Sequence, residues 1–230
     1  MLYIVGTPIG NLSDLSSAQI AAIFTADILL AEDTRSAGIL LQKITASSGY
    51  PRNQAQRTIS YYKEKEFEKL AEVISWLKEG KKVVLISESG LPLMSDPGLL
   101  LVRQMIRENQ PFTVVPGPSA VTTALLYSGF DPTRHMFLGF LPKKEGELRH
   151  LLEKVEGALK LLPKTAVVFF ESPLRIRATL AVFNELLPGA KIAVCREMTK
   201  KFEEIIRGQA KDLMNRDYRG EITVVFTLDK

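Results

Sequence analysis

Short hydrophobic runs alternate with amphipathic stretches along the first half of the chain. The runs are rich in leucine and β-branched residues and lack polar alternation, which is typical of strands buried on both faces of a parallel sheet. Strands are predicted at Leu2–Val5, Ile28–Ala31, Val83–Ile86 and Phe112–Val115. Helices are predicted between them at Ser17–Ala26, Ser36–Ile44, Glu64–Glu79 and Gly98–Glu108. This order is typical of an open α/β sheet.

The helix predicted at Glu64–Glu79 carries a clear apolar stripe. Phe67, Leu70, Ile74 and Leu77 recur at helical spacing. Residues at this spacing share one side of a helix, so we expect these four side chains to form its buried face.

The second half of the chain is less regular. The predicted helices are Val121–Ser128, Glu147–Leu162 and Ile176–Leu187, and the predicted strands are Ala166–Phe170, Ile192–Cys195, Phe202–Arg207 and Ile222–Leu228. The passage Gly129–Pro142 is rich in glycine and proline and leads to the helix at Glu147–Leu162. Because the last two strands are close in sequence, we expect them to pair antiparallel, which makes this a mixed sheet.

A turn with the sequence VVPGPSA separates the two halves. We predict an N-terminal α/β domain at 1–115 with a mostly parallel sheet. A C-terminal α/β domain, with a mixed sheet and flanking helices, is predicted at 116–230. No internal repeat or low-complexity tract interrupts either half.

Composition restricts the kinds of site that the chain can build. At 230 residues, with 46% hydrophobic and 24% charged residues, it has the values of a globular protein with a substantial core. The single cysteine, Cys195, excludes an internal disulfide, and His135 and His150 are too few to complete a zinc or haem site. We therefore expect no metal. Cys195 lies in an apolar run and is predicted to be a buried structural thiol.

The opening residues MLYIVGTPIG lack a basic segment of the kind found in secretory signals. No apolar run approaches the length of a membrane span. The expected location is the reducing cytoplasm, with no membrane partner.

The net charge of +4 is unevenly distributed. Residues 1–115 hold 12 Lys and Arg against 12 Asp and Glu, whereas residues 116–230 hold 18 against 14. The basic second half is compatible with a polyanionic partner. An ordinary solvated surface explains the charge equally well.

Three loops rich in glycine and proline follow predicted strands. They have the sequences GTPIGN after Leu2–Val5, SESGLPLMSDPG after Val83–Ile86 and PGPSA after Phe112–Val115. The carboxyl ends of parallel strands share one edge of a sheet, where α/β proteins bind ligands. Glycine and proline let backbone groups approach a ligand closely, which suits a polar ligand of little net charge. Neither G-x-G-x-x-G nor a Walker motif is present in the sequence.

Seven blocks of the sequence resemble one known family. They are GTPIGN, AEDTR at 31–35, SESGLPLMSDPG, VVPGPSA, GFLPKK at 139–144, FFESPLR at 169–175 and REMTKKFEEIIRG at 196–208. Together, and in this order, they resemble the ribosomal RNA small subunit methyltransferase I family. That family belongs to the tetrapyrrole-methylase-like superfamily of S-adenosylmethionine enzymes.

The resemblance implies a two-domain tetrapyrrole methylase-like α/β fold, a homodimer, and S-adenosylmethionine as cofactor in a cleft between the domains. It implies 2′-O-methylation of a cytidine ribose in small-subunit ribosomal RNA, which is then the partner. The residues that it places around the cofactor are Pro8, Ser87, Glu88, Ser89, Gly90, Met94, Ser119, Ala120, Phe170 and Glu171.

The chain departs from the family pattern at two places. Members usually have Asp-Ala-Gly-Thr where this chain has Glu88-Ser89-Gly90-Leu91, and a histidine where it has Leu174. Glu88 keeps the carboxylate, so cofactor binding is expected to be retained. Leu91 and Leu174 remove polar groups, which changes the expected contacts to the substrate.

A ribose hydroxyl is a weak nucleophile, so a general base would assist its methylation. The candidate carboxylates are Asp33, Glu88, Asp96, Glu171 and Glu197. Each has a structural alternative in the sequence. Asp33 and Asp96 could cap the helices that follow them, and Glu197 could pair with a neighbouring cation.

The candidate phosphate contacts are Arg35, Lys143, Lys144, Arg175, Arg196, Lys200 and Lys201. Tyr61, Tyr62, Phe169 and Phe170 could stack on a flipped base, although a core strand is the better interpretation of the last two.

Two other functions are compatible with the same residues. One is a small-molecule methyltransferase of the superfamily that acts on a tetrapyrrole; the basic second half and the AEDTR and REMTK blocks argue against it. The other is a non-catalytic RNA-binding paralogue that has lost the cofactor.

Overall fold

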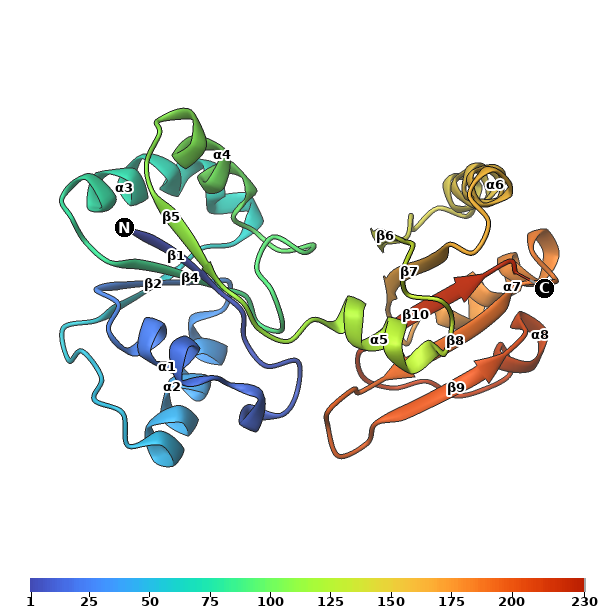
Figure 1. The fold of residues 1–230 in the computed structure, drawn as a ribbon, viewed down its shortest axis with the longest axis horizontal. Helices are drawn as coiled ribbons and strands as arrows, with labels where there is room; N and C mark the ends of the chain where they lie inside the picture. Colours follow the sequence, from blue (N-terminus) through green and yellow to red (C-terminus); the bar gives the residue numbers. More distant parts are fainter. Residues whose placement is uncertain (230) are drawn as a thin grey trace. The chain divides into compact units, whose positions relative to one another are not determined.

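The computed structural model describes residues 1–229, shown in Figure 1. It consists of two compact units, one of Met1–Ser119 and one that starts at Ala120. The domain boundary predicted after Val115 falls in the same PGPSA segment.

The first unit is built on a five-stranded sheet in which every neighbouring pair of strands is parallel. Its strand order is β3-β2-β4-β1-β5, with β1 at Leu2–Val5, β2 at Ile28–Ala31, β3 at Arg57–Ser60, β4 at Val83–Ile86 and β5 at Phe112–Val115. The four predicted strands are confirmed, and β3 was missed. Its sequence, RTIS, has no apolar run because β3 lies at an edge and is only partly buried.

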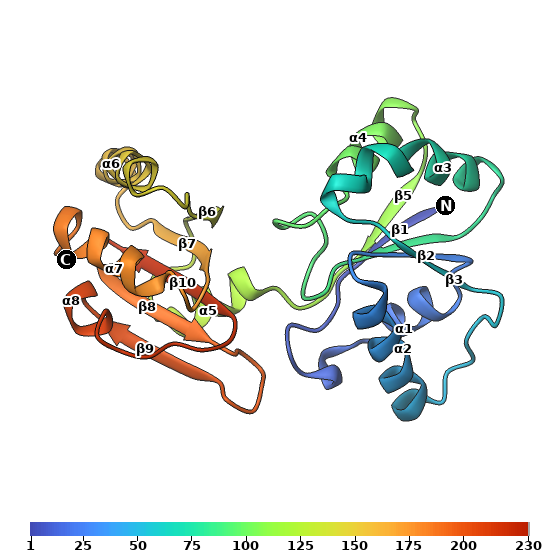
Figure 2. The same ribbon diagram turned by 180° about the vertical axis from the view of Figure 1, so that it is seen from behind.

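Helices cover both faces of this sheet (Figures 1 and 2). On one face lie α1 (Ser17–Phe24) and α2 (Thr34–Ser48), and on the other lie α3 (Glu66–Lys78) and α4 (Leu99–Arg107). Two short 3-10 turns, η1 (Leu12–Asp14) and η2 (Lys63–Lys65), precede α1 and α3. Each face has its own apolar core, so residues from alternate positions of the strands enter opposite cores.

A buried carboxylate sets the orientation of α3. The Glu66 side chain turns into the unit, where its Oε1 accepts N–H groups from Gly98 at 3.1 Å, Leu100 at 2.8 Å and Leu101 at 3.4 Å. It thereby caps the N-terminus of α4, where a negative charge is favourable. The expected position of Phe67 on the buried face is wrong: its side chain is 79% exposed, because Glu66 occupies the inward position one residue earlier.

The second unit contains a mixed five-stranded sheet. Its order is β6-β7-β10-β8-β9, with β6 at His135–Phe140, β7 at Ala166–Glu171, β8 at Lys191–Arg196, β9 at Glu204–Gly208 and β10 at Ile222–Thr227. Only β6 and β7 pair parallel. The strand β6 lies inside the passage Gly129–Pro142, where no strand was predicted, because its two bordering turns and Gly139 conceal the apolar pattern.

The predicted pairing of the last two strands is wrong, because β8 lies between β9 and β10. All six residues of β10 are buried, so it needs a partner on each side. Strand β9 contains Glu204 and Arg207, both exposed, and these charges suit an edge strand.

The two faces of this sheet are covered unequally. Helices α6 (Glu145–Leu161), α7 (Ile176–Leu186) and α8 (Ala210–Leu213) pack over one face. Among the helices in residues 1–229, α5 (Ala120–Ser128) makes the main contacts with β7, β10 and β8 on the other. Cys195 is buried under α5, and burial raises the pKa of its thiol to about 12. The predicted structural thiol is therefore confirmed.

We predict that Glu66→Ala will lower the free energy of unfolding by about 2–4 kcal/mol, because three helix N–H groups lose a charged acceptor inside the unit. The matched control is Glu68→Ala on the exposed side of the same helix, which should change it by less than about 0.5 kcal/mol. Urea denaturation of both variants measures the difference. Equal stabilities would show that the cap contributes nothing.

Candidate functional site

The loops that follow β1, β4 and β5 meet at the carboxyl edge of the first sheet, as predicted from the sequence. These three strands are adjacent in the sheet. The backbone N–H of Thr7 donates to the carbonyl oxygen of Gly90 at 2.8 Å, and its hydroxyl donates toward the carbonyl oxygen of Ser87 at 3.2 Å. Thr7 is fully buried, so it fastens the first loop to the second without exposing a polar group.

The first and third loops touch through glycine. A Cβ on Gly6 would lie 2.9 Å from the Cα of Gly117, so only glycine permits this approach of backbone to backbone. The buried Gln19 side chain completes the joint, since its Nε2 donates to the carbonyl oxygen of Gly6 at 2.7 Å. Its Oε1 accepts from Ser16, at the start of α1.

The long loop between β4 and α4 has an unusual backbone. Leu93 and Ser95 have φ angles of 72° and 80°, and Gly90 and Gly98 have φ angles of 80° and 122°. Non-glycine residues seldom adopt this region, and the conformation costs about 1–3 kcal/mol for each of them. The loop is therefore held in a shape that its own residues disfavour, with Thr7 at one end and Glu66 at the other.

Two carboxylates at this edge, Glu32 and Asp96, have raised pKa values. Burial, followed by the charges of Glu32 and Glu88, raises the pKa of Asp96 to about 6. Burial also raises the pKa of Glu32, with the charges of Glu88 and Glu64 adding to it. Such a half-buried cluster disfavours further negative charge and favours a cation or a proton.

Asp33 caps the helix that follows it, which was its predicted structural role. Its carboxylate caps α2 by accepting the N–H of Arg35 at 2.7 Å, and it also binds the Arg35 guanidinium at 2.8 Å. These bonds lower the pKa of Asp33 to about 2. Asp96 does not take its alternative, because Glu66 caps α4 in its place.

The predicted cofactor residues are distributed over both units. Pro8, Ser87, Glu88, Ser89, Gly90, Met94 and Ser119 belong to the three loops of the first unit, and Ala120, Phe170 and Glu171 belong to the second. Among the former, Ser87 donates its hydroxyl to the carbonyl oxygen of Gly90 at 3.0 Å, while Glu88 and Met94 are exposed.

Glu171 is buried at the end of β7 and has several partners. Its carboxylate accepts the hydroxyl of Thr179 at 2.7 Å and the N–H of Ser172 at 2.8 Å. The Arg175 guanidinium lies 3.4 Å from the same carboxylate and donates to the carbonyl oxygens of Leu141 and Pro142 at 3.1 and 2.8 Å. These contacts describe a clamp between two loops; the predicted roles of Glu171 and Arg175 toward cofactor and RNA stay predictions.

The other predicted contacts differ in how far they are already engaged. Glu197 accepts the N–H of Glu221 at 2.9 Å and pairs with Lys200 at 3.2 Å, and these partners lower its pKa. Arg196 pairs with Glu204 at 3.0 Å. Arg35, Lys143, Lys144 and Lys201 are exposed. Lys144 forms an exposed pair with Glu147, at 3.2 Å.

The predicted stacking residues are mostly unavailable to a base. Tyr61 and Phe169 are fully buried, and Phe169 lies in the core, which confirms the better interpretation of that residue. Tyr62 and Phe170 are partly buried.

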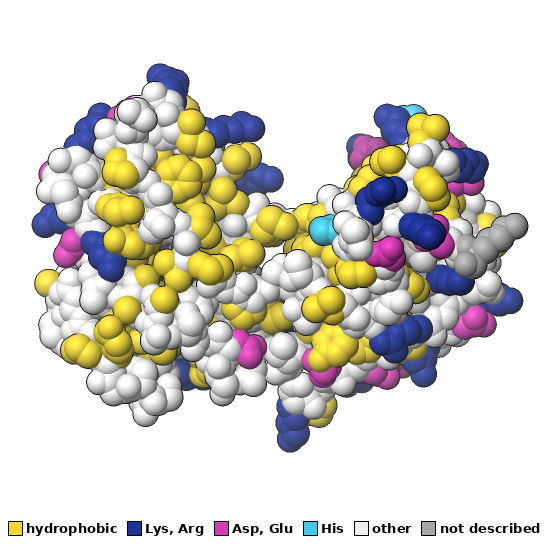
Figure 3. Space-filling view, in the orientation of Figure 1, with side chains coloured by type: hydrophobic (Ala, Val, Ile, Leu, Met, Phe, Trp, Pro, Cys, Tyr) yellow, Lys and Arg dark blue, Asp and Glu magenta, His cyan; other side chains and the backbone are white. Residues whose placement is uncertain are grey.

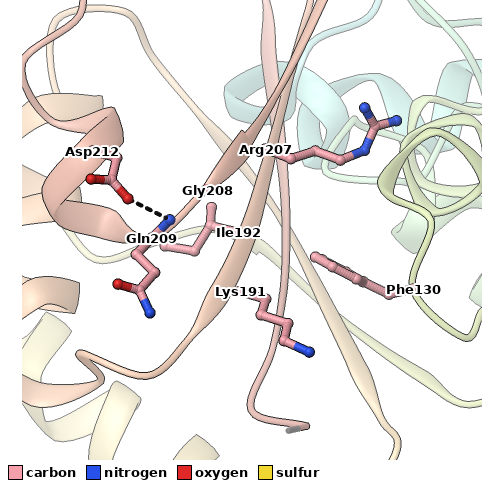
Figure 4. Close-up of a pocket in the computed structure, with 7 residues that line it drawn as sticks. All are labelled: Phe130, Lys191, Ile192, Arg207, Gly208, Gln209 and Asp212. Atoms are coloured by element: carbon pink, nitrogen blue, oxygen red, sulfur yellow. Dashed lines mark hydrogen bonds between the residues drawn. The ribbon is translucent and has the colours of Figure 1, made fainter.

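A separate hollow of about 390 Å³ opens in the second unit (Figure 4). It is lined by Phe130, Lys191, Ile192, Arg207, Gly208, Gln209 and Asp212. Arg207 already donates to the carbonyl oxygens of Ser128 and Tyr127 at the end of α5. Its charge is therefore used to hold the helix, and we assign no ligand to this hollow.

Within residues 1–229, no three His, Cys, Asp or Glu side chains gather in a way that could hold a metal ion. No helix in the same range is long and apolar enough to cross a membrane.

Two residues of this edge were missed from the sequence. Glu32 lies beside Asp33 in the AEDTR block, but only the second carboxylate was chosen. Thr7 lies in GTPIGN, where the glycines and the proline drew attention to the turn and not to the hydroxyl that fastens it. The signal for Glu32 was its place directly after a buried strand.

Known proteins share both the sequence and the fold. Residues 1–214 match the family model of tetrapyrrole (corrin/porphyrin) methylases. A ribosomal RNA small subunit methyltransferase I from Thermotoga maritima is 36% identical over 230 residues, which cover 98% of this chain and 97% of the relative. A protein of the same name from Bacillus subtilis is 36% identical over 98% of this chain and 74% of the relative.

Among solved structures, the uroporphyrin-III C-methyltransferase of Thermus thermophilus complexed with S-adenyl homocysteine superposes with a TM-score of 0.64 at 16% identity, covering 98% of this chain and 96% of that chain. A diphthine synthase superposes with a TM-score of 0.68 at 12% identity, over 98% and 89% of the two chains. These similarities show the shared two-unit α/β fold. With the family model matched along most of the chain and relatives more than a third identical, the chain belongs to the tetrapyrrole methylase family and groups with the ribosomal RNA small subunit methyltransferases I.

Proposed function

We propose that this protein transfers a methyl group from S-adenosylmethionine to small-subunit ribosomal RNA, at the ribose 2′-hydroxyl of a cytidine. The observation that carries the proposal is the identity to methyltransferases I along nearly the whole chain, 36% to the Thermotoga maritima protein. The three-loop edge of the first unit supports it, because this edge occupies the usual ligand position of an α/β sheet.

The residues at that edge suit the proposed cofactor. S-adenosylmethionine carries positive charge on its sulfonium and its ammonium. The half-buried Glu32 and Asp96 and the exposed Glu88 supply negative charge at this edge. The loop backbones and the Ser87 and Ser89 side chains supply hydrogen-bonding groups for the rest of it. A ligand with several phosphates would be repelled by the same carboxylates.

When bound, S-adenosylmethionine supplies an activated methyl group on a sulfonium and leaves as a neutral thioether. The chain's own residues then have two tasks: to hold the ribose hydroxyl in line with that methyl group, and to accept the proton that the hydroxyl loses. We propose Asp96 as the acceptor. Its pKa of about 6 leaves it ionised at neutral pH yet basic enough to take a proton, whereas Asp33 is held near 2 by its pair with Arg35.

We also propose that the protein acts as a homodimer. Several large apolar side chains are exposed on α4 and β5, among them Leu99, Ile106 and Val114 at 48%, 64% and 53%. Figure 3 shows hydrophobic side chains gathered over this part of the first unit. A second copy of the chain would cover such a surface.

The function is tested with labelled S-adenosylmethionine and small subunits that lack the modification. We expect label in the RNA, in a nucleoside that mass spectrometry of the digest identifies as 2′-O-methylcytidine. Assembled subunits should be better substrates than short oligonucleotides, because a folded RNA presents a splayed nucleotide. Label on a base, or label accepted only by a tetrapyrrole, would refute the proposal. Absence of cofactor binding would instead favour the non-catalytic paralogue.

Gly90→Ala should weaken the binding of S-adenosylmethionine by roughly tenfold or more, because the added Cβ lies 3.3 Å from Ile9 Cγ2 and shifts the loop edge. Gly80→Ala is the matched control. Gly80 has nearly the same φ angle, 81° against 80°, but its Cβ would meet open space. Calorimetric titration of both folded variants measures the effect. Undiminished affinity in Gly90→Ala would place the cofactor elsewhere.

Asp96→Asn should lower the rate of methylation by roughly a hundredfold. It should also abolish the rise in activity that we expect of the unmodified protein as pH passes about 6.

The same substitution should affect stability. A raised carboxyl pKa stabilises the fold at low pH, and that contribution is lost as pH rises through about 6. At neutral pH the asparagine variant should therefore unfold at the same or a higher temperature.

The readouts are a pH profile of methylation and thermal unfolding. The control is Glu68→Gln on the exposed side of α3, which should leave both unchanged. An unaltered pH profile in Asp96→Asn would exclude Asp96 as the base.

A further inference from the structure

Strand β6 contains a bulge that reverses the direction of one side chain. Its register against β7 runs from Phe137 opposite Val168 to Phe140 opposite Phe170. Three steps along β6 therefore match two steps along β7. Gly139, which lies in this irregular stretch, has a φ angle of 64°. Such bulges bend a strand and re-aim the side chain that follows.

Without the bulge, Phe140 would point to the side of the sheet that the helices cover. Met136 and Leu138 pack against the core beneath α6 and α7, so alternation places Phe137 on the opposite face. A regular strand would put Phe140 on the face of Leu138. The extra residue instead puts it with Phe137, on the face against which α5 packs.

The result is a cluster of three phenylalanines at the carboxyl end of β6 and β7. The ring of Phe170 lies 4.9 Å from that of Phe137 and 5.5 Å from that of Phe140, both edge to face. Phe137 and Phe170 are half-buried, whereas Phe140 remains 60% exposed. Figures 1 and 2 show β6 at one edge of its sheet, with α5 lying against the strands farther in. Phe140 therefore packs against Phe170 on one side and faces solvent on the other.

Positive charge follows the exposed ring directly in the chain. Lys143 and Lys144 are exposed, and Lys143 makes no ion pair within residues 1–229. The loop that carries them is fixed, because Arg175 donates to the carbonyl oxygens of Leu141 and Pro142 while it contacts the buried Glu171. An aromatic face and a lysine are thus presented together on a rigid segment.

We propose that Phe140 stacks on an unpaired base of single-stranded RNA while Lys143 contacts an adjacent phosphate. An aromatic ring beside a cation is the combination by which proteins grip single-stranded RNA. Neither a core role nor helix packing explains an exposed phenylalanine for which the strand has been bulged. The inference rests on the proposed function for the choice of RNA, and Arg175 serves as a positioning residue.

The experiment measures binding of a fluorescently labelled single-stranded RNA of mixed sequence to the full chain, without cofactor and over a series of salt concentrations. Phe140→Ala should weaken binding by roughly 5-fold to 100-fold and leave the salt dependence unchanged. Phe140→Trp should retain or improve binding. Phe140→Leu, which keeps apolar area but lacks a π face, should resemble the alanine variant.

Lys143→Ala should weaken binding and reduce the slope of affinity against salt by about one unit. The matched control is Phe67→Ala, which removes an even more exposed phenylalanine from α3 and should change nothing. A set of 2-aminopurine RNAs, each with the probe at a different position, adds a direct readout, because stacking quenches the fluorescence of this base analogue. At one or more positions the quenching should disappear in the alanine variant.

Equal affinity in Phe140→Ala and the unmodified chain would overturn the proposal, and so would leucine performing as well as phenylalanine. Failure of the unmodified chain to bind single-stranded RNA would overturn it too. So would a Phe140→Ala variant that loses affinity for a free planar tetrapyrrole but not for RNA. Because no methyl transfer is measured, these outcomes are separate from failure of the proposed function. A chain that binds RNA through Phe140 but methylates nothing would contradict only the function.

Discussion

The close approach of backbone to backbone at the carboxyl edge of the first sheet is the constraint on which the candidate site depends. Gly6 and Gly117 touch with no room for a Cβ, and Thr7 binds the carbonyl oxygen of Gly90. Three loops from distant parts of the chain thereby become one surface. Each contact uses either a glycine or a buried, hydrogen-bonded polar group. The three loops are therefore held together without an apolar core between them.

Buried carboxylates extend this rigidity into the loops. Glu66 gives the long loop a fixed end by capping α4, and Glu171 with Arg175 does the same for the loops that follow β6 and β7. Placing a carboxylate inside a protein costs free energy unless its oxygens find donors. Both side chains find backbone N–H or hydroxyl donors. These donors engage both carboxylates, whereas the raised pKa of Asp96 comes from burial and from repulsion by Glu32 and Glu88.

The two units are both α/β, but they present different surfaces. The first offers backbone groups and carboxylates, which suit a compact ligand with positive charge. The second offers an aromatic cluster and exposed lysines, which suit a chain of bases and phosphates.

Much of the architecture could be predicted from the sequence, because strands buried on both faces leave an unmistakable run of apolar residues. Leu2–Val5, Ile28–Ala31 and Val83–Ile86 were located in this way, and the loops after β1, β4 and β5 followed from parallel pairing. Edge strands leave no such run. Strand β3 is half-exposed and β6 is bulged at Gly139, so both escaped detection.

The site residues divide along the same line. Gly90 and Asp96 lie in a loop whose length and composition already indicated a ligand site, and AEDTR indicated a carboxylate after β2. Local sequence does not decide which carboxylate caps a helix and which stays available. The tertiary structure decides it, because Glu66, 32 residues before Gly98, caps the N-terminus of α4. The pairing of β10 between β7 and β8, and the outward turn of Phe140, were decided in the same way. Local sequence determines where a chain turns and which side chains prefer burial, but the partner of a buried polar group or strand depends on what the rest of the fold brings beside it.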